Sequence, residues 1–279
     1  MSMSIRTNVA SLNAQRNLYS TQNALDTSLS RLSSGYRITK AGDDAAGLGI
    51  STKLESQIKS YGQAVRNAND GLSVIQSTEA ALNESANILT RLRELAMQSG
   101  SDGIGASERG YVNTEATALV NELERIAQVT NYNGTQLLDG TNASGLDFQI
   151  GINNSASGFD AIHFATIDAT TGASGLNVSG LDLSSKASAL SALDVIDQAL
   201  SSVSKNRADL GAAGNRLQSA INNIQAFSES LSAANSRIKD VDVAEETSQM
   251  SRLQILSQAG VSVLAQANQM PQLALKLLG

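Results

Sequence analysis

The chain has 279 residues, a net charge of −6, no Trp and an aromatic content of only 3%. This length could hold one or two ordinary domains, but a compact enzyme core would normally contain more large rings. The absence of Cys excludes disulfides, thiol catalysis and thiolate metal sites, and the single histidine, His163, excludes sites built from several histidines. The acidic balance gives no electrostatic reason to expect binding to nucleic acid.

The first ten residues, MSMSIRTNVA, lack the apolar run that a secretory signal peptide requires. We therefore expect a protein that is cytosolic or exported by another route. Apolar residues recur at helical spacing as far as Leu32 and then stop at an irregular connector that contains Gly35. We expect this segment to pair with the C-terminal one, and its candidate core residues are Ile5, Val9, Leu12, Leu25, Leu29 and Leu32.

The connector ahead of the next helix is rich in glycine and aspartate, and its candidate residues are Asp43, Asp44, Gly47 and Gly49. Aspartate is favoured at the first positions of helices, where its carboxylate accepts from free backbone N–H groups. The aspartate pair could also bind a divalent ion, but the segment offers no further acidic ligand nearby. A helix start is therefore the preferred interpretation.

Two long helices are predicted by apolar residues that recur at spacings of 3 and 4. One series runs from Leu54 to Ala96 and the other from Leu193 to Ile238, where ten of fourteen positions are large and apolar. A sustained 3.5-residue period specifies long helices that wind around each other. We therefore expect the two helices to be partners in one bundle, although about a hundred residues separate them.

A third helix is predicted from about residue 107 to residue 129, after a glycine-containing stretch that lets it fold back on the second. Asn133-Gly134 and Asp139-Gly140 then mark turns. Beyond these turns the chain is expected to change from helices to strands.

A small β-hairpin is predicted where the apolar period changes to 2, at Phe148–Ile152 and again at Ile162–Phe164. His163 alternates with apolar neighbours, so we expect an exposed strand residue rather than a catalytic one. Residues 170–188 are rich in Gly, Ser, Ala and Thr, which indicates a surface loop before the last long helix.

The C-terminal segment carries apolar residues on two adjacent helical stripes, and its candidate core residues are Leu253, Leu256, Val263, Leu264, Met270 and Leu277. Residues 253–275 carry no charge and are long enough to cross a bilayer, but their many amide side chains would lose water there. An apolar surface on more than one face implies partners on more than one side. We therefore expect this segment to become ordered only on docking with the N-terminal segment and with neighbouring copies.

Seven stretches spread over nearly the whole chain resemble bacterial flagellins. In chain order they are IRTNVASLNAQRNL (residues 5–18), SRLSSGYRI (30–38), AGDDAAGLGI (41–50), NGTQLLDG (133–140), FQIGIN (148–153), SRIKDVDV (236–243) and MSRLQILSQAGVSVLAQANQMPQ (250–272). The two C-terminal stretches are the most specific.

The resemblance implies a mainly α fold, a long coiled-coil helical bundle with one small β-hairpin region. Residues 1–42 and 239–279 would form the coiled coil of the filament core, and residues 43–140 and 189–238 the surrounding shell. Residues 141–188 would hold only the hairpin and a loop, which leaves no room for the large outer domains of longer flagellins.

In function, the resemblance implies a structural subunit that polymerises head to tail with itself into the extracellular flagellar filament used for swimming. It also implies a cytosolic export chaperone on the C-terminal segment, passage through the flagellar type III channel without a cleaved signal peptide, and contact with cap and junction proteins. Residues 43–49 of the connector would contact neighbouring subunits. No cofactor, nucleic acid or membrane insertion is implied.

One segment, Leu89–Gln98, resembles the part of flagellins that the host Toll-like receptor recognises, with Arg91, Glu94 and Leu95 at the matching positions. Arg91 and Leu95 share a helix face because they are four residues apart. The alternative is that Leu95 belongs to the core of the bundle and that Arg91 and Glu94 form an ordinary surface ion pair.

Two other functions fit the sequence less well. An enzyme is disfavoured because the chain has no HExxH, GxSxG or P-loop motif, and a single His leaves most hydrolytic mechanisms without a base. A flagellar hook–filament junction protein would share the terminal heptads. The LAQANQMPQ stretch and the DDAAG block, however, resemble those of the filament subunit.

Overall fold

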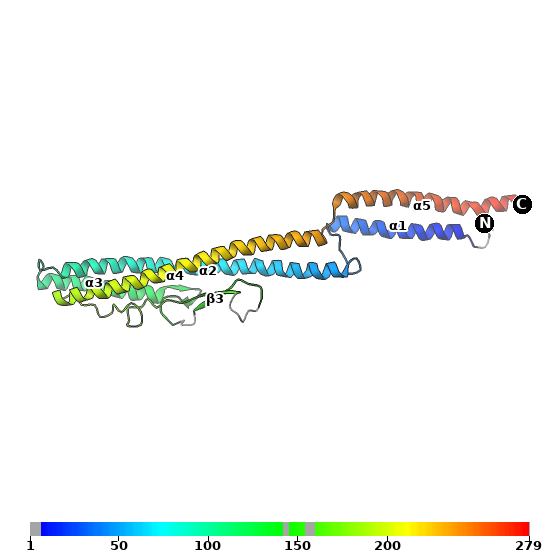
Figure 1. Ribbon diagram of the computed structural model, residues 1–279. Coiled ribbons are helices and arrows are strands. Elements are labelled where there is room, and N and C mark those ends of the chain that lie inside the picture. The colour runs from blue at the N-terminus through cyan, green and yellow to red at the C-terminus, as the bar shows by residue number, and fades with distance from the viewer. Residues whose placement is uncertain (1–6, 142–144, 154–159, 279) are drawn as a thin grey trace. The chain divides into compact units, whose positions relative to one another are not determined.

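The computed structural model describes residues 7–141, 145–153 and 160–278, with side chains as far as residue 269 (Figure 1). The elements of these parts of the chain are α1 (Val9–Ser34), α2 (Ala45–Ser99), α3 (Ala106–Val129), β1 (Asn131–Tyr132), β2 (Thr135–Gln136), β3 (Leu146–Gln149), β4 (Ala161–Phe164), α4 (Lys186–Lys239) and α5 (Val243–Leu278). The prediction of a mainly α-helical fold with long helices is confirmed. The strand region contains a second short hairpin in addition to the predicted one.

The chain divides into two compact units. The terminal unit consists of residues 1–58 and 229–279, and the central unit consists of residues 59–228. Helices α2 and α4 therefore each give one end to the terminal unit and most of their length to the central unit. The domain limits predicted at residues 42 and 239 lie close to helix ends, whereas the division into compact units falls inside α2 and α4.

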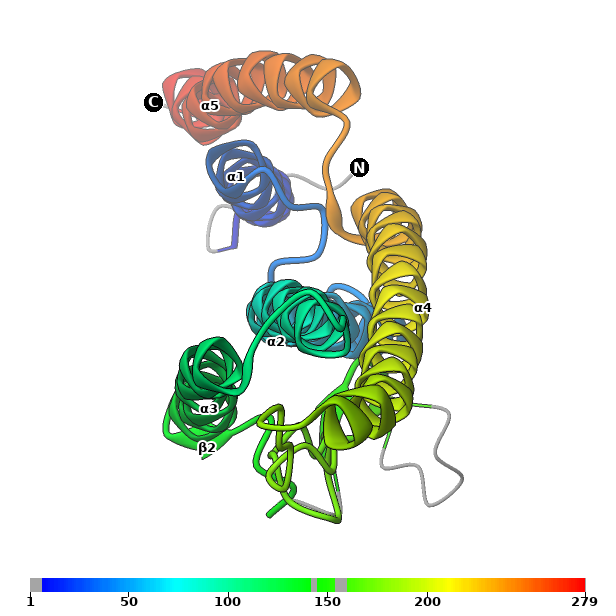
Figure 2. The ribbon, with the colours of Figure 1, turned by 90° about the vertical axis from the view of Figure 1, so that its left-hand side faces the viewer.

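The core of the central unit lies among α2, α3, α4 and the strands and loops that join them (Figure 2). Its largest fully buried side chains are Leu82, Leu89, Leu92, Leu95, Leu123, Leu137, Leu138, Val178, Leu183, Ile196, Leu210 and Leu217. On α4 the buried residues Ile196, Val203, Leu210 and Leu217 follow one another at seven-residue intervals. This is the seam that the heptad series predicts for a coiled coil.

Polar residues that interrupt the two apolar series pair with partners across the helices. Arg207 of α4 lies 3.8 Å from Glu79 of α2, and Arg93 of α2 lies 2.6 Å from Asp197 of α4. Both pairs are solvent exposed, so each contributes less than about 1 kcal/mol to stability. Their effect is to favour one register of α2 against α4.

The first hairpin, β1–β2, closes with a two-residue turn. Asn133 and Gly134 have φ of 50° and 81°, the left-handed conformation that such turns require. The chain then continues through the fully buried Leu138, whose carbonyl accepts from the Ala169 N–H at 2.9 Å. This bond ties the loop after β4 to the end of the first hairpin.

The second hairpin, β3–β4, is the predicted one. Phe148 lies opposite Ile162, and both Ile162 and Phe164 are buried. The side chain of His163 is 56% exposed, and its Nδ1 lies 2.8 Å from Asp147 Oδ1 on the neighbouring strand. The prediction that His163 is an exposed strand residue is confirmed.

The predicted first strand of this hairpin reached Ile152, whereas β3 ends at Gln149. The N–H groups of Ile150 and Gly151 both donate to the Asp160 carbonyl, at 2.8 and 2.7 Å. Two residues therefore oppose one, as in a β-bulge, and the regular pairing stops.

Candidate functional site

Helices α1 and α5 form an antiparallel pair within the terminal unit (Figure 1). At one end the Asn8 side chain donates to the Ala267 carbonyl at 2.7 Å, and at the other end Arg31 lies 3.9 Å from Glu246. Asn8 also caps α1, because its side-chain oxygen accepts from the Ser11 N–H. The structure thus brings the two terminal segments together, as their apolar stripes lead us to expect.

The facing surfaces of α1 and α5 carry many small side chains. The partly buried or buried positions at spacings of 3 and 4 are Ser11, Ala14, Leu18, Thr21, Leu25, Ser28 and Leu32 on α1 and Glu246, Met250, Leu253, Ser257, Gly260, Leu264 and Ala267 on α5. A Cβ atom at Gly260 would lie 3.2 Å from Leu18 Cδ1, so Leu18 packs on bare backbone. Among the described residues of the pair, only Ser28 and Leu253 are buried. Helices owe most of their stability to tertiary packing, so this pair alone is weakly stabilised.

The outer faces of the same two helices expose large apolar side chains. Nine of them are at least 46% exposed, and they are Val9, Leu12, Tyr19, Leu29, Val243, Ile255, Leu256, Val261 and Val263. Soluble proteins rarely leave so many apolar groups together in water unless the surface binds a partner. The exposed faces of α1 and α5 are therefore the strongest candidate for an interaction surface.

The candidate core residues of the sequence fall into three groups. Those on the facing surfaces are Leu25, Leu32, Leu253 and Leu264. Those on the exposed faces are Val9, Leu12, Leu29, Leu256 and Val263. Ile5 lies outside the described residues, as do the side chains of Met270 and Leu277. Their role in assembly stays a prediction.

The linker between α1 and α2 is folded by its two aspartates. Asp43 Oδ2 accepts from the N–H and hydroxyl of Thr39 and from the Lys40 N–H, at 2.9–3.0 Å. The bond from the Thr39 N–H, followed by that from the Lys40 N–H, holds the pKa of Asp43 below its ordinary value. Asp44 Oδ1 accepts from the Gly47 N–H at 2.8 Å and so caps the start of α2.

Gly47 and Gly49, which were predicted to lie in the connector, lie instead in the first turns of α2, and they differ in what surrounds them. A Cβ atom at Gly47 would lie 2.5 Å from Asp44 Oδ2 and 2.8 Å from Ile38 Cδ1, whereas one at Gly49 would meet no atom within 4 Å. Gly47 is therefore required by the fold of the linker, and Gly49 is not. Across the residues that the structure describes, no group of three or more His, Cys, Asp or Glu side chains could hold a metal ion.

The α1–α2 linker contacts the end of α4 and the short segment that joins α4 to α5, and the local sequence gives no signal for these contacts. Tyr36 pairs with Asp240 in an isolated antiparallel bridge, and Lys239 Nζ lies 4.5 Å from the centroid of the Tyr36 ring. The same ammonium group lies 2.5 Å from Glu55 Oε1, and this hydrogen bond raises the pKa of Lys239. Glu55 and Lys239 are 184 positions apart, so only the folded chain reveals their pairing.

The segment that resembles the receptor site lies on α2 in the central unit. Arg91 pairs with Glu94 and with Glu115 of α3, each at 2.9 Å, and all three side chains are about half exposed. Leu95 is only 1% exposed and belongs to the core. A partner that binds this surface would therefore meet Arg91 and Glu94 rather than Leu95.

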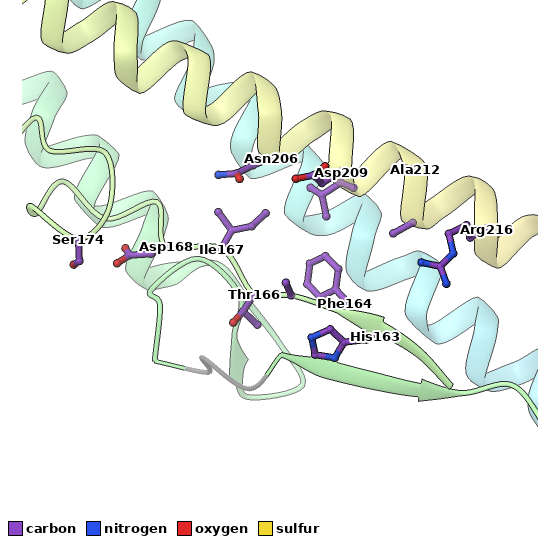
Figure 3. A pocket seen from close by; sticks show the side chains of 13 residues that line it. His163, Phe164, Thr166, Ile167, Asp168, Ser174, Asn206, Asp209, Ala212 and Arg216 are labelled. Carbon is purple, nitrogen blue, oxygen red and sulfur yellow. The ribbon is translucent and has the colours of Figure 1, made fainter. Parts of the chain in front are cut away.

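A groove of about 560 Å³ lies in the central unit between α4 and the chain that follows β4 (Figure 3). Asn206, Asp209 and Arg216 extend from α4, and His163 and Asp168 come from the opposite wall. The His163 ring is already bonded to an aspartate of β3, and the other charges are of both signs. This lining does not form the nucleophile and base of a catalytic site.

Comparisons with known proteins decide the family. Residues 5–143 match the bacterial flagellin N-terminal helical region, and residues 193–278 match the bacterial flagellin C-terminal helical region. A flagellin of Halalkalibacterium halodurans is 42% identical over 276 residues, which cover 99% of this chain and 100% of the relative. The chain belongs to the bacterial flagellin family. A flagellin of Bacillus subtilis is 41% identical with the same coverage of both chains.

Other flagellins agree in fold and show how short this one is. The crystal structure of Bacillus cereus flagellin is 31% identical with a TM-score of 0.50, over 57% of this chain and 88% of that chain. Polar flagellin C of Vibrio parahaemolyticus is 34% identical over 384 positions that cover both chains in full. Because this alignment exceeds 279 positions, the present flagellin lacks residues that the Vibrio protein has.

Membership in the flagellin family establishes the general function of the chain. This flagellin is a structural subunit that polymerises into the bacterial flagellar filament, the extracellular organelle of swimming motility. The relatives named above are flagellins, which does not support a hook–filament junction protein. Within the described parts of the chain, no helix has the length and hydropathy needed to cross a membrane.

Proposed function

We propose that α1 and α5 are the elements through which this flagellin assembles, and that neighbouring subunits cover their exposed apolar faces in the filament. The observation that supports this proposal is that nine large apolar side chains are exposed on a helix pair that, among its described residues, buries only Ser28 and Leu253. In this arrangement residues 1–42 and 239–279 form the filament core. Residues 43–140 and 189–238 form the shell around it.

The start of α2 is a further contact surface in this proposal. Asp43 and Asp44 fold the linker, and Gly47 fits where a side chain would collide with Ile38. Gly49 has open space around it, and its neighbour Ile50 is 53% exposed. Close approach of another subunit would explain why a glycine without an intramolecular role stands next to an exposed apolar residue.

The route to the filament follows from the same apolar faces. Before assembly the exposed apolar faces would have to be shielded from water, and a cytosolic chaperone bound to α5 would shield them. The chain would then pass unfolded through the type III export channel, without cleavage of a signal peptide, and add beside cap and junction proteins. The absence of Cys and the presence of a single Pro suit a chain that unfolds and refolds without slow steps. No catalytic role belongs to this scheme.

A second role is proposed for the surface of α2 around Arg91. The ion pairs among Arg91, Glu94 and Glu115 form a charged patch on two helices. This patch would bind the host Toll-like receptor for flagellin on monomers, with the buried Leu95 supporting the helix from the core.

The substitution Leu264→Asp tests the assembly proposal. Leu264 is partly buried on the same face of α5 as Gly260, which contacts α1, so a carboxylate there would lose water without gaining a partner. We expect the central unit to keep its helical circular dichroism and thermal midpoint, while filament yield in sedimentation and electron microscopy falls by more than about tenfold. The volume-conserving Leu264→Met should assemble normally. Normal filament yield from the aspartate variant would contradict the proposal.

A further inference from the structure

The junction between α4 and α5 contains no residue that breaks a helix, since it consists of only three residues, Asp240, Val241 and Asp242. The α1–α2 linker contains Gly35 and Gly42, and the α2–α3 turn at residues 100–105 contains three glycines. Asp and Val are each less favourable than Ala in a helix by only about 0.7 kcal/mol or less. Asp242 can start a new helix, but the junction contains no residue that forces α4 to stop at Lys239.

The backbone N–H of Val241, at the junction, is hydrogen-bonded to the α1–α2 linker. In a continuous helix the Val241 N–H would donate to the Arg237 carbonyl four residues earlier. It donates instead to the Gly35 carbonyl at 3.0 Å. The Asp242 carboxylate then accepts from the Ala244 N–H at 2.9 Å and starts α5 as a new helix.

The last two carbonyls of α4 are occupied in the same way. In a continuous helix the Ile238 carbonyl would accept from Asp242 and the Lys239 carbonyl would accept from Val243. The Arg37 guanidinium donates to the first of these carbonyls at 2.8 Å, and the Arg37 N–H donates to the second at 2.6 Å. The break loses five helical hydrogen bonds, those that the N–H groups of residues 241–245 would donate. Three of the new bonds go to Gly35 or Arg37, and two go from the Ala244 and Glu245 N–H groups to the Asp242 carboxylate.

We propose that residues 35–37 act as a wedge that divides one long helix into α4 and α5. Docking of this wedge exchanges five helical hydrogen bonds for three bonds to the N-terminal linker and two to the Asp242 carboxylate, so the exchange is nearly balanced in hydrogen bonding. When the wedge is not docked, α4 continues across residues 240–242. The junction is then a switch that is set by the N-terminal half of the chain.

Side chains around the wedge hold it in place. Ile38, directly after it, is 3% exposed, and the Tyr36 ring lies under the Lys239 ammonium group, which also holds Glu55 at the start of α2. Release of the first turns of α2 therefore also loosens the wedge. The consequence for assembly is an order of events, in which α5 takes its direction only after residues 35–37 have docked.

The backbone conformation of Val241 tests this inference. Arg37→Pro removes the N–H and the guanidinium that occupy the two carbonyls, and leaves the junction sequence unchanged. Full-length monomers of this variant, labelled with ¹³C-valine, are expected to show the Val241 Cα resonance shifted downfield into the helical range. Wild-type filaments, measured by solid-state NMR, are expected to show it outside that range.

A second variant controls for the position of the probe. Val243→Pro, added to Arg37→Pro, prevents a helix across residues 239–243 but is compatible with the first position of α5. In this double variant the Val241 resonance should return to a non-helical value. A non-helical Val241 in Arg37→Pro monomers, or a helical one in wild-type filaments, would overturn the inference. Because the monomer measurement needs no polymerisation, its result is independent of the filament yield of Leu264→Asp.

Discussion

At Gly71 the absence of a side chain makes room for the β3–β4 hairpin. A Cβ atom there would lie 3.0–3.2 Å from three ring carbons of Phe148, whereas one at Gly62 on the same helix would meet nothing within 4 Å. Gly71→Val should therefore displace Phe148 and lower the free energy of unfolding of the central unit by about 1–3 kcal/mol in urea titrations. The matched Gly62→Val should change it by less than about 1 kcal/mol. Equal losses in the two variants would show that Phe148 does not depend on Gly71.

Glu124 fastens the loop after β4 to α3. Its Oε2 accepts from the N–H and from the hydroxyl of Thr171, both at 2.8 Å. These bonds, the backbone one first, hold the pKa of Glu124 below its ordinary value. A lowered carboxyl pKa contributes stability that is fully present above the unfolded pKa of about 4.3 and is lost as the pH falls through the folded value.

The variant Glu124→Gln should therefore be less stable than the wild type at pH 7. The difference between their free energies of unfolding should shrink as the pH is lowered toward about 3, because the wild-type carboxylate then becomes protonated. Urea titrations of both proteins at several pH values measure this difference. A difference that stayed constant with pH would show that the charge of Glu124 plays no part in holding Thr171.

At the scale of elements, the loop that precedes α4 is hydrogen-bonded to the end of α2 and to α3. Asn113 Oδ1 accepts from the Leu183 N–H at 2.8 Å, and Ser99 Oγ donates to the Leu183 carbonyl at 2.5 Å. Leu183 is fully buried, so its N–H has no access to water. Asn113→Leu should leave this donor unpaired and lower the free energy of unfolding by about 1–3 kcal/mol.

Asn113→Asp provides the comparison, because it keeps an acceptor oxygen at the same place. Chemical unfolding should show that Asn113→Asp lowers the free energy of unfolding clearly less than Asn113→Leu does. If both variants lowered the free energy of unfolding equally, the unpaired Leu183 N–H would not be the cause of the lost stability.

The long helices could be predicted because their signal repeats over many turns. The series from Leu54 to Ala96 lies within α2, and the series from Leu193 to Ile238 lies within α4. The ends of elements depend on distant partners and could not be predicted in the same way. β3 stops where Asp160 takes two donors, and α4 stops where residues 35–37 occupy its last carbonyls.

The candidate site was predictable in its residue types but not in its geometry. Apolar periodicity marks both stripes of α5, yet α1 covers part of each stripe and leaves the rest of each exposed. Leu253 and Leu264 lie toward α1, whereas Leu256 and Val263 are exposed. Which apolar residues of α5 face α1 depends on the close packing of Leu18 on Gly260, and no local pattern specifies this packing. The pairing of Lys239 with Glu55 likewise had no sequence signal.

At the scale of the whole molecule, the two units differ in how they are stabilised. The central unit has a continuous core of buried side chains contributed by three helices and the loops between them. The α1–α5 pair of the terminal unit is held by partly buried small residues and leaves large apolar residues in water. Regions with few buried apolar contacts open with low free energies. We therefore expect α1 and α5 to gain most of their stability from neighbouring subunits.

Amide hydrogen exchange, compared residue by residue between monomers and filaments, tests this expectation most directly. In monomers the amides of α1, and those of α5 after Glu245, should exchange almost as fast as in an unfolded chain, while those of the central unit stay protected. In filaments the amides of α1 and α5 should slow by about a hundredfold or more. Monomers in which α1 and α5 are as well protected as in filaments would contradict the account.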